Sequence, residues 1–87
     1  MKTFVLSITS PEGNLFLGDV LQISVRGVEG DLAVMAGHIP FATALAEGEC
    51  RIYLPDGRMR RARVGGGLLS VSREETSLLS SDFTFLS

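Results

Sequence analysis

The segment VEGDLAVMAGHIP, residues 28–40, contains the only histidine of the chain. An imidazole can act as a general base, bind a metal or contact another protein. A metal site needs further ligands, and Cys50 and the scattered carboxylates do not have a ligand spacing typical of one. A hydrolytic triad needs a nucleophile on a sharp turn and an orienting acid, and the sequence shows neither. We therefore assign no catalytic, metal-binding or cofactor-binding residue. His38 is then either a loop residue that hydrogen-bonds nearby backbone or part of a contact surface.

The glycine triplet at residues 65–67 is a second candidate, because glycine-rich loops can hold phosphate groups. Such loops require a following helix whose amide groups face the anion, together with a lysine or spaced glycines. Here the triplet is followed directly by LLSVS, which has the pattern of a strand. The sequence therefore favours a bulge or a sharp bend where two backbones approach closely.

A third candidate is an arginine-rich hairpin. Five of the eight basic residues lie on either side of the turn at residues 55–57: Arg51, Arg58, Arg60, Arg61 and Arg63. A nucleic-acid-binding strand can have this composition, but only Tyr53 supplies an interleaved aromatic ring. The carboxylates of Glu47, Glu49 and Asp56 lie at the ends of the same hairpin. We interpret the hairpin as a solvated or protein-facing surface whose charges help to guard a sheet edge.

Length and composition limit the class of protein. With 87 residues the chain has room for one core and hence one domain, residues 1–87. Its 45% hydrophobic and 21% charged content is typical of a folded protein, and its net charge of -2 predicts no overall attraction to nucleic acid or anionic lipid. The single Cys50 cannot form an internal disulfide and favours a reducing compartment. No apolar run reaches the length of a membrane span, so we expect no direct membrane insertion.

Alternation of apolar and polar residues with a period of two dominates the chain and predicts strands with one buried face. In residues 19–27, Leu21, Ile23 and Val25 point to one side and are expected to be buried. The same pattern predicts strands at 3–9, 31–35, 41–45, 50–54, 58–64, 68–72 and 76–80, and a less regular one at 14–17. Turn residues fall between them at 11–13, 27–30, 46–49, 55–57 and 73–75. No amphipathic helix is predicted, so the fold class is all-β.

The order of these segments resembles the amino-terminal domain of the epsilon subunit of F-type, rotary ATP synthase. The resemblance covers residues 4 to about 80. It is carried by EGDL at residues 29–32, by GHIP at residues 37–40 and by the glycine pair before a hydrophobic strand at residues 66–71. The resemblance implies a flattened sandwich of about ten short strands, which agrees with the alternation.

The resemblance also implies a function in the central stalk, where such a domain binds the gamma subunit and rests on the membrane ring of c subunits. The subunit couples ion flow through that ring to ATP synthesis, is not itself a catalyst, and is peripheral to the cytoplasmic face of the energy-coupling membrane. The implied contacts with the c ring are Glu29, Asp31 and His38, in two neighbouring loops at one end of the sandwich. The implied contacts with the gamma subunit are Ser10, Ala42 and Thr43.

The chain departs from the family pattern in several places. Ala36 replaces a common proline before Gly-His, Gly65 lengthens the glycine pair, and the ending SSDFTFLS differs from the usual acidic, alanine-rich exit. The family's carboxy-terminal pair of helices has no counterpart in these 87 residues. Because those helices restrain ATP hydrolysis and in some members hold ATP, we expect this chain to support coupling without either property.

Two other functions are compatible with the residues. A free-standing sandwich could bind a peptide or a polyanion through the arginine-rich hairpin, and its affinity would then fall steeply with salt. A small hydrolase that uses His38 is the weakest alternative, because the sequence shows no nucleophile to accompany it. The rotor subunit is the function that the sequence favours.

Overall fold

The computed structural model describes residues 2–86 as ten strands with no helix in that range. The strands are β1 (Phe4–Ser10), β2 (Gly13–Val20), β3 (Gln22–Gly27), β4 (Gly30–Met35), β5 (Phe41–Leu45), β6 (Gly48–Tyr53), β7 (Met59–Val64), β8 (Gly67–Val71), β9 (Glu75–Leu79) and β10 (Phe83–Phe85). The expected all-β class is confirmed.

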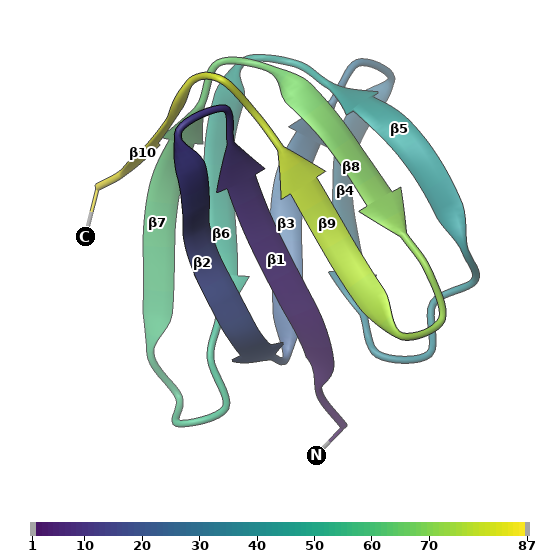
Figure 1. The fold of residues 1–87 in the computed structure, drawn as a ribbon. Helices are drawn as coiled ribbons and strands as arrows, with labels where there is room; N and C mark the ends of the chain where they lie inside the picture. Colours follow the sequence, from purple (N-terminus) through teal and green to yellow (C-terminus); the bar gives the residue numbers. More distant parts are fainter. Residues whose placement is uncertain (1, 87) are drawn as a thin grey trace.

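The strands form one ten-stranded sheet that curls into two layers (Figure 1). Its order is β10-β7-β6-β3-β5-β8-β9-β1-β2, with β4 paired to β3. One layer contains β2, β1, β9, β8 and β5, and the other contains β4, β3, β6, β7 and β10. The two layers are joined by a single paired position, Gly27 with Leu45, between β3 and β5. The sheet can therefore bend sharply at that point.

The core lies between the layers and follows the alternation of the strands. Inward-facing side chains such as Leu6, Ile23, Ile52 and Leu69 are fully buried, whereas their chain neighbours face outward. Removal of this apolar surface from water stabilises the fold by about 25 cal/mol per Å². Cys50 is one of the buried residues, as its alternation predicts, and burial raises the pKa of its thiol to about 12. It is a packing residue in this fold.

Two predicted turns depend on glycine. In the β6–β7 hairpin Gly57 has a φ of 91°, the conformation expected at the end of a Pro-Asp-Gly turn. In the glycine triplet Gly67 has a φ of 152°, and a Cβ atom there would meet the carbonyl oxygen of Leu79 on β9. The triplet is therefore a bend with close backbone approach, and the interpretation against a phosphate loop is confirmed for its local structure.

One strand prediction was wrong, and one strand was not predicted. Residues 19–27 do not form one strand: Asp19 and Val20 end β2, and a bend at Leu21 carries the chain to β3 in the other layer. Leu21 is accordingly only half-buried, because it lies at this corner, where its N–H donates to the carbonyl of Tyr53 at 2.8 Å. The strand β10 was not predicted, because its three residues are too few for alternation to be recognised.

The packing of β3 gives the first testable prediction. Ile23→Ala should lower the free energy of unfolding by about 2–5 kcal/mol, because it leaves a cavity in the single core. Met35→Ala on the neighbouring β4 is the control: its side chain is 56% exposed, so the change should stay within about 0.5 kcal/mol. Denaturant unfolding measures both variants. Equal losses would mean that the inward face of β3 has been assigned wrongly.

Candidate interaction surfaces

The structure gives His38 a local role in its loop. Its Nδ1 atom lies 2.9 Å from the carbonyl oxygen of Ile39, to which it donates when that nitrogen carries the proton. Its backbone N–H donates to the carbonyl oxygen of Met35, and the centre of its ring lies 4.9 Å from the ring centre of Phe41. Within residues 2–86 no cluster of three or more His, Cys, Asp and Glu side chains could hold a metal ion. The environment of His38 fits a loop-shaping or contact residue.

The acidic pair Glu29 and Asp31 lies at the β3–β4 turn. Asp31 is opposite Arg26 in the register, and its carboxylate contacts the Arg26 guanidinium at 3.4 Å. The Asp31 side chain is 78% exposed, and Glu29 is exposed at the tip of the turn. An exposed ion pair of this length contributes little to stability, so both carboxylates are available to a partner.

The two loops that carry Asp31 and His38 are not neighbours. Asp31 begins β4 and pairs with Arg26, whereas Met35 ends the strand and pairs with Gln22. A six-residue strand spans roughly 17 Å, which separates the β3–β4 turn from the loop of His38. Figure 1 shows the turn at the upper end of the sandwich and the β4–β5 loop at the lower end. The expectation that they cluster at one end was wrong, because a hairpin strand must lie between them.

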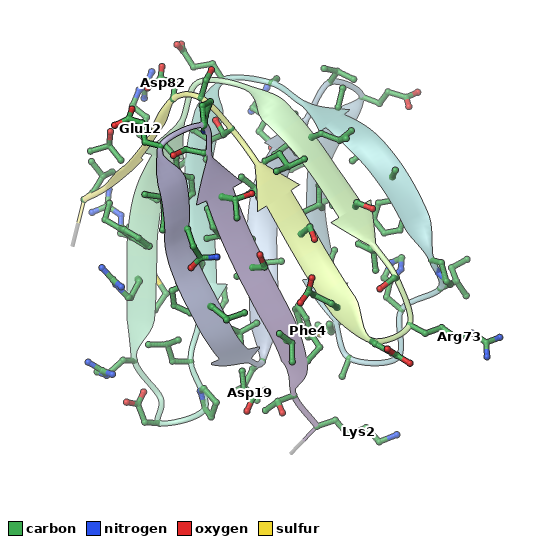
Figure 2. All side chains as sticks on the ribbon, in the orientation of Figure 1. Lys2, Phe4, Glu12, Asp19, Arg73 and Asp82 are labelled. Carbon is green, nitrogen blue, oxygen red and sulfur yellow. The ribbon has the colours of Figure 1, made fainter. Side chains whose placement is uncertain are left out.

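The acidic turn shares the upper end with other carboxylates. Glu12 in the β1–β2 turn and Asp82 before β10 both lie at that end (Figure 2), and Glu47 lies in the β5–β6 turn beside them in the fold. Glu47 is 3.2 Å from Arg63, and Lys2, Arg73 and Asp19 lie at the opposite end. The upper end therefore gathers the carboxylates of Glu12, Glu29, Asp31, Glu47 and Asp82, and we call it the acidic upper end.

The three residues expected to contact the gamma subunit do not share a surface. Ala42 faces outward on β5, but the neighbouring Thr43 faces the interior and its hydroxyl donates to the carbonyl of Ala44 at 3.3 Å. Ser10 lies at the β1–β2 turn, where its hydroxyl accepts the N–H of Glu12 and contacts the carbonyl of Gly13. Only Ala42 lies well within an outer sheet face.

Most side chains of that outer face, on the layer β2-β1-β9-β8-β5, are small or apolar. One row crosses all five strands in register, from Leu17 through serines to Ala42, and a second row includes Leu68 and Leu79. We call it the leucine–serine face, composed of Ser7, Leu15, Leu17, Ala42, Ala44, Leu68, Ser70, Ser77 and Leu79. Its four leucines are between 41% and 65% exposed. The next row of the same sheet face carries the charged residues Asp19 and Glu75, and the Ser77 hydroxyl donates to the Glu75 carboxylate at 3.4 Å.

This face was not predicted from the sequence, although the outward residues of three strands indicate it. In FATAL, LLSVS and TSLLS the residues that alternate with buried ones are serine, alanine and leucine rather than charged residues. Solvated strands usually carry Lys, Arg, Glu or Asp at such positions. A hollow of about 640 Å³ adjoins the face at its upper end and is lined by Leu68, Leu79 and the glycine triplet. A contiguous exposed patch of this kind marks an interaction surface.

The outer face of the other layer is charged and internally paired. Glu49 accepts hydrogen bonds from Arg51 at 2.6 Å and from Arg61 at 2.7 Å, and Arg58 contacts Asp56 at 2.7 Å. A groove of about 800 Å³ over this face is lined by residues of both signs.

The remaining arginine of the hairpin, Arg60, faces the opposite side of β7 and lies 3.8 Å from the ring centre of Phe85 on β10. The strand β7 lies between β6 and β10, but β10 pairs only with residues 62–64 of β7. The expectation that the arginines guard an edge is therefore contradicted for that half of the strand. Each of the five arginines has an intramolecular partner, which weakens the case for a polyanion site.

The paired arginines give a second prediction. Hydrogen bonds from Arg61 and then Arg51 hold the pKa of Glu49 below its ordinary value of 4.5. A carboxylate whose pKa is lowered by folding stabilises the folded state at pH values above the pKa that the group has in the unfolded chain. This stabilisation is lost as the pH falls through the pKa that the group has in the folded protein. NMR titration of the Glu49 carboxyl carbon should show the lowered midpoint. Arg61→Gln should raise the midpoint of Glu49, and the control Arg58→Gln should leave it unchanged. A Glu49 midpoint of 4.5 or higher in the unaltered chain would contradict the prediction.

Comparison with known proteins identifies the family. The family model described as "ATP synthase, Delta/Epsilon chain, beta-sandwich domain" matches residues 3–85. The chain is 34% identical over 79 residues to the sodium-ion-specific ATP synthase epsilon chain of Acetobacterium woodii, which covers 91% of this chain and 59% of that protein. It is 36% identical over 80 residues to the epsilon chain of Bacillus velezensis, covering 92% and 60%. The chain thus spans about three-fifths of the length of these curated relatives.

Solved structures share the fold. A chain of the Euglena gracilis mitochondrial ATP synthase structure that contains OSCP, F1 and the c-ring superposes with a TM-score of 0.90 at 23% identity, covering 97% of this chain and 54% of that one. A chain from the central stalk and c-ring of the Tetrahymena thermophila enzyme gives 0.76 at 13% identity, covering 94% and 66%. No helix in residues 2–86 is long and apolar enough to cross a membrane. On the sequence match, the chain belongs to the family of ATP synthase delta/epsilon chain β-sandwich domains.

Proposed function

We propose that this domain is a non-catalytic rotor element in the central stalk of an F-type ATP synthase. It would couple ion flow through the membrane ring of c subunits to ATP synthesis by the catalytic subunits, at the cytoplasmic face of the energy-coupling membrane. Family membership and the two epsilon-chain relatives support this assignment. The observation that carries it is the leucine–serine face, because exposed leucine, alanine and serine side chains that cross five adjacent strands are typical of an interaction surface rather than of a solvated one.

The leucine–serine face is proposed as the surface that binds the gamma subunit. Its central residues, Ser7, Ser70 and Ser77, are small, so a partner can approach the sheet closely, and the leucines around them offer apolar contact. Hydroxyl groups among apolar side chains are compatible with a permanent interface, since they can hydrogen-bond across it. Ala42 belongs to this surface. Ser10 lies at its end, and Thr43 supports it from within.

The c ring is proposed to contact the acidic upper end through Glu29 and Asp31. Carboxylates on a protruding turn can pair with basic side chains in the polar loops of a partner without any change in the core. His38 lies at the other end of β4, so one flat contact cannot include it together with Asp31. We assign His38 to the shape of its own loop and leave the ring contact to the acidic turn.

The gamma contact gives a third prediction. Ser70→Glu places a charge at the centre of the leucine–serine face and should weaken binding of purified gamma subunit at least about tenfold, because the carboxylate would be buried without a partner. Ala33→Glu is the matched control: Ala33 is exposed on β4 in the other layer, and its variant should bind as the unaltered chain does. If both variants bind equally well, the leucine–serine face is not the gamma contact.

The ring contact gives a fourth prediction. In the reconstituted enzyme Asp31→Lys should reduce ion-driven ATP synthesis, because the reversed charge would repel basic groups of the ring. Its free energy of unfolding should change by no more than about 0.5 kcal/mol. The control is Glu74→Lys in the exposed β8–β9 turn at the lower end, which should retain full synthesis. Full synthesis by Asp31→Lys would remove the acidic turn from the proposed contact.

A further inference from the structure

The path of the sheet has two ends, β10 and β2, which differ in how they are protected, and β4, which pairs only with β3 among the described residues, is a third edge strand. At the first end β10 is three residues long. The backbone beyond it is held by a hydrogen bond from the Leu86 N–H to the backbone carbonyl of Arg61 at 2.8 Å. At the second end β2 is eight residues long and pairs only with β1 among the described residues. Of these three edge strands β2 is the longest, and it alone belongs to the layer that carries the leucine–serine face.

The edge of β2 lacks most of the features that keep natural edge strands from pairing. Such strands usually carry lysine, proline or inward-pointing charges, or are very short. Residues 13–20 contain no lysine, arginine or proline, and Asp19 is their only charge. A bulge at Leu15 interrupts the ladder, since Ile8 pairs with Phe16 and Thr9 already pairs with Asn14. Residues 16–20 remain as a regular, unprotected edge.

The direction of the backbone groups along this edge follows from the register. The carbonyl of Thr9 accepts the N–H of Ser80, so the odd-numbered residues of β1 direct their backbone groups toward β9. The even-numbered residues of β1 must then bond to β2, where their partners are Phe16, Gly18 and Val20. The N–H and C=O groups of Leu17 and Asp19 consequently point away from the sheet. Figure 2 shows Asp19 at the lower end of β2 with its side chain directed away from the ribbon.

We propose that an extended segment of the gamma subunit adds to this edge as a further strand, pairing with the backbone of Leu17 and Asp19. This inference rests on the proposed function. The Leu17 side chain, 65% exposed, belongs to the leucine–serine face, so a partner lying on that face reaches the edge without a gap. Addition of a strand supplies main-chain hydrogen bonds, and alternate apolar side chains of the added segment would contact Leu17.

A second copy of this chain is a poorer occupant of the edge. Antiparallel pairing of two β2 strands about Leu17 would set Asp19 of each copy opposite Leu15 of the other. Leu15 is the bulged position, where the regular ladder of β2 is interrupted. Such a pair would be limited to a few bonds, whereas a partner segment can run along the regular residues 16–20 in the register that suits it.

The test compares variants that differ only in the outward N–H group. Leu17→Pro and Leu17→Ala both remove the leucine side chain, but only proline also removes the outward N–H, which is tolerated at a free edge. Binding of purified gamma subunit should be at least about fivefold weaker for Leu17→Pro than for Leu17→Ala, since one interfacial hydrogen bond is lost. Asp19→Pro and Asp19→Ala form a second pair with the same expectation, and it decides the matter if Leu17→Pro fails to fold.

Amide hydrogen exchange of the unaltered chain provides the second measurement. The amides of Leu17 and Asp19 should exchange rapidly in the isolated chain and become protected in the gamma complex, while those of Phe16 and Gly18 are protected in both. Binding without that protection, and with equal affinities within each pair, would overturn the added strand and leave the rotor function intact. Protection that grows with chain concentration alone would assign the edge to a second copy. Failure of the unaltered chain to bind gamma would overturn both proposals.

Discussion

A single core shared by two layers is the constraint on which the rest of this structure depends. A chain of 87 residues cannot support two cores, so each strand must direct one set of alternate side chains to the same interior. Within residues 2–86, fourteen hydrophobic residues are buried there, drawn from strands of both layers. The sequence is then free to vary on the outer faces and in the turns, so a binding function must reside in those places.

The two outer faces differ in the residues that they expose. On β6 and β7 the outward residues are arginines and glutamates that pair with one another, which satisfies their charges within the domain. On β1, β5, β8 and β9 most of them are serine, alanine and leucine, and Glu75 at the start of β9 is the one charged residue among them. The proposed rotor element would hold one partner along its length and meet another at its end. The leucine–serine face and the acidic upper end would provide two separate surfaces for these contacts.

Much of the fold could be predicted from alternation, because inward residues such as Ile23 and Val25 recur with a period of two. The break at Leu21 could not be predicted, since the apolar pattern continues through a corner where the chain changes layers. The strand β10 is too short to show a period, and its place beside β7 depends on contacts distant in sequence.

The candidate sites were harder to predict than the fold. Asp31 and His38 are close in sequence, but a six-residue strand between them places them at opposite ends of the sandwich. The leucine–serine face joins five strands that are not consecutive in the chain, so its extent appears only when the register is known. The family resemblance of the sequence was confirmed, whereas the grouping of contact residues that it implied was not.

Photocrosslinking in the assembled enzyme tests the central claim, that the leucine–serine face is the surface covered by the gamma subunit. A photoreactive amino acid would replace Ser77, at the centre of that face, or Ala33, on the outer face of the other layer. Crosslinks to the gamma subunit are expected from position 77 and none from position 33. Crosslinks to gamma from position 33 alone would contradict the claim and would assign the gamma contact to the charged layer.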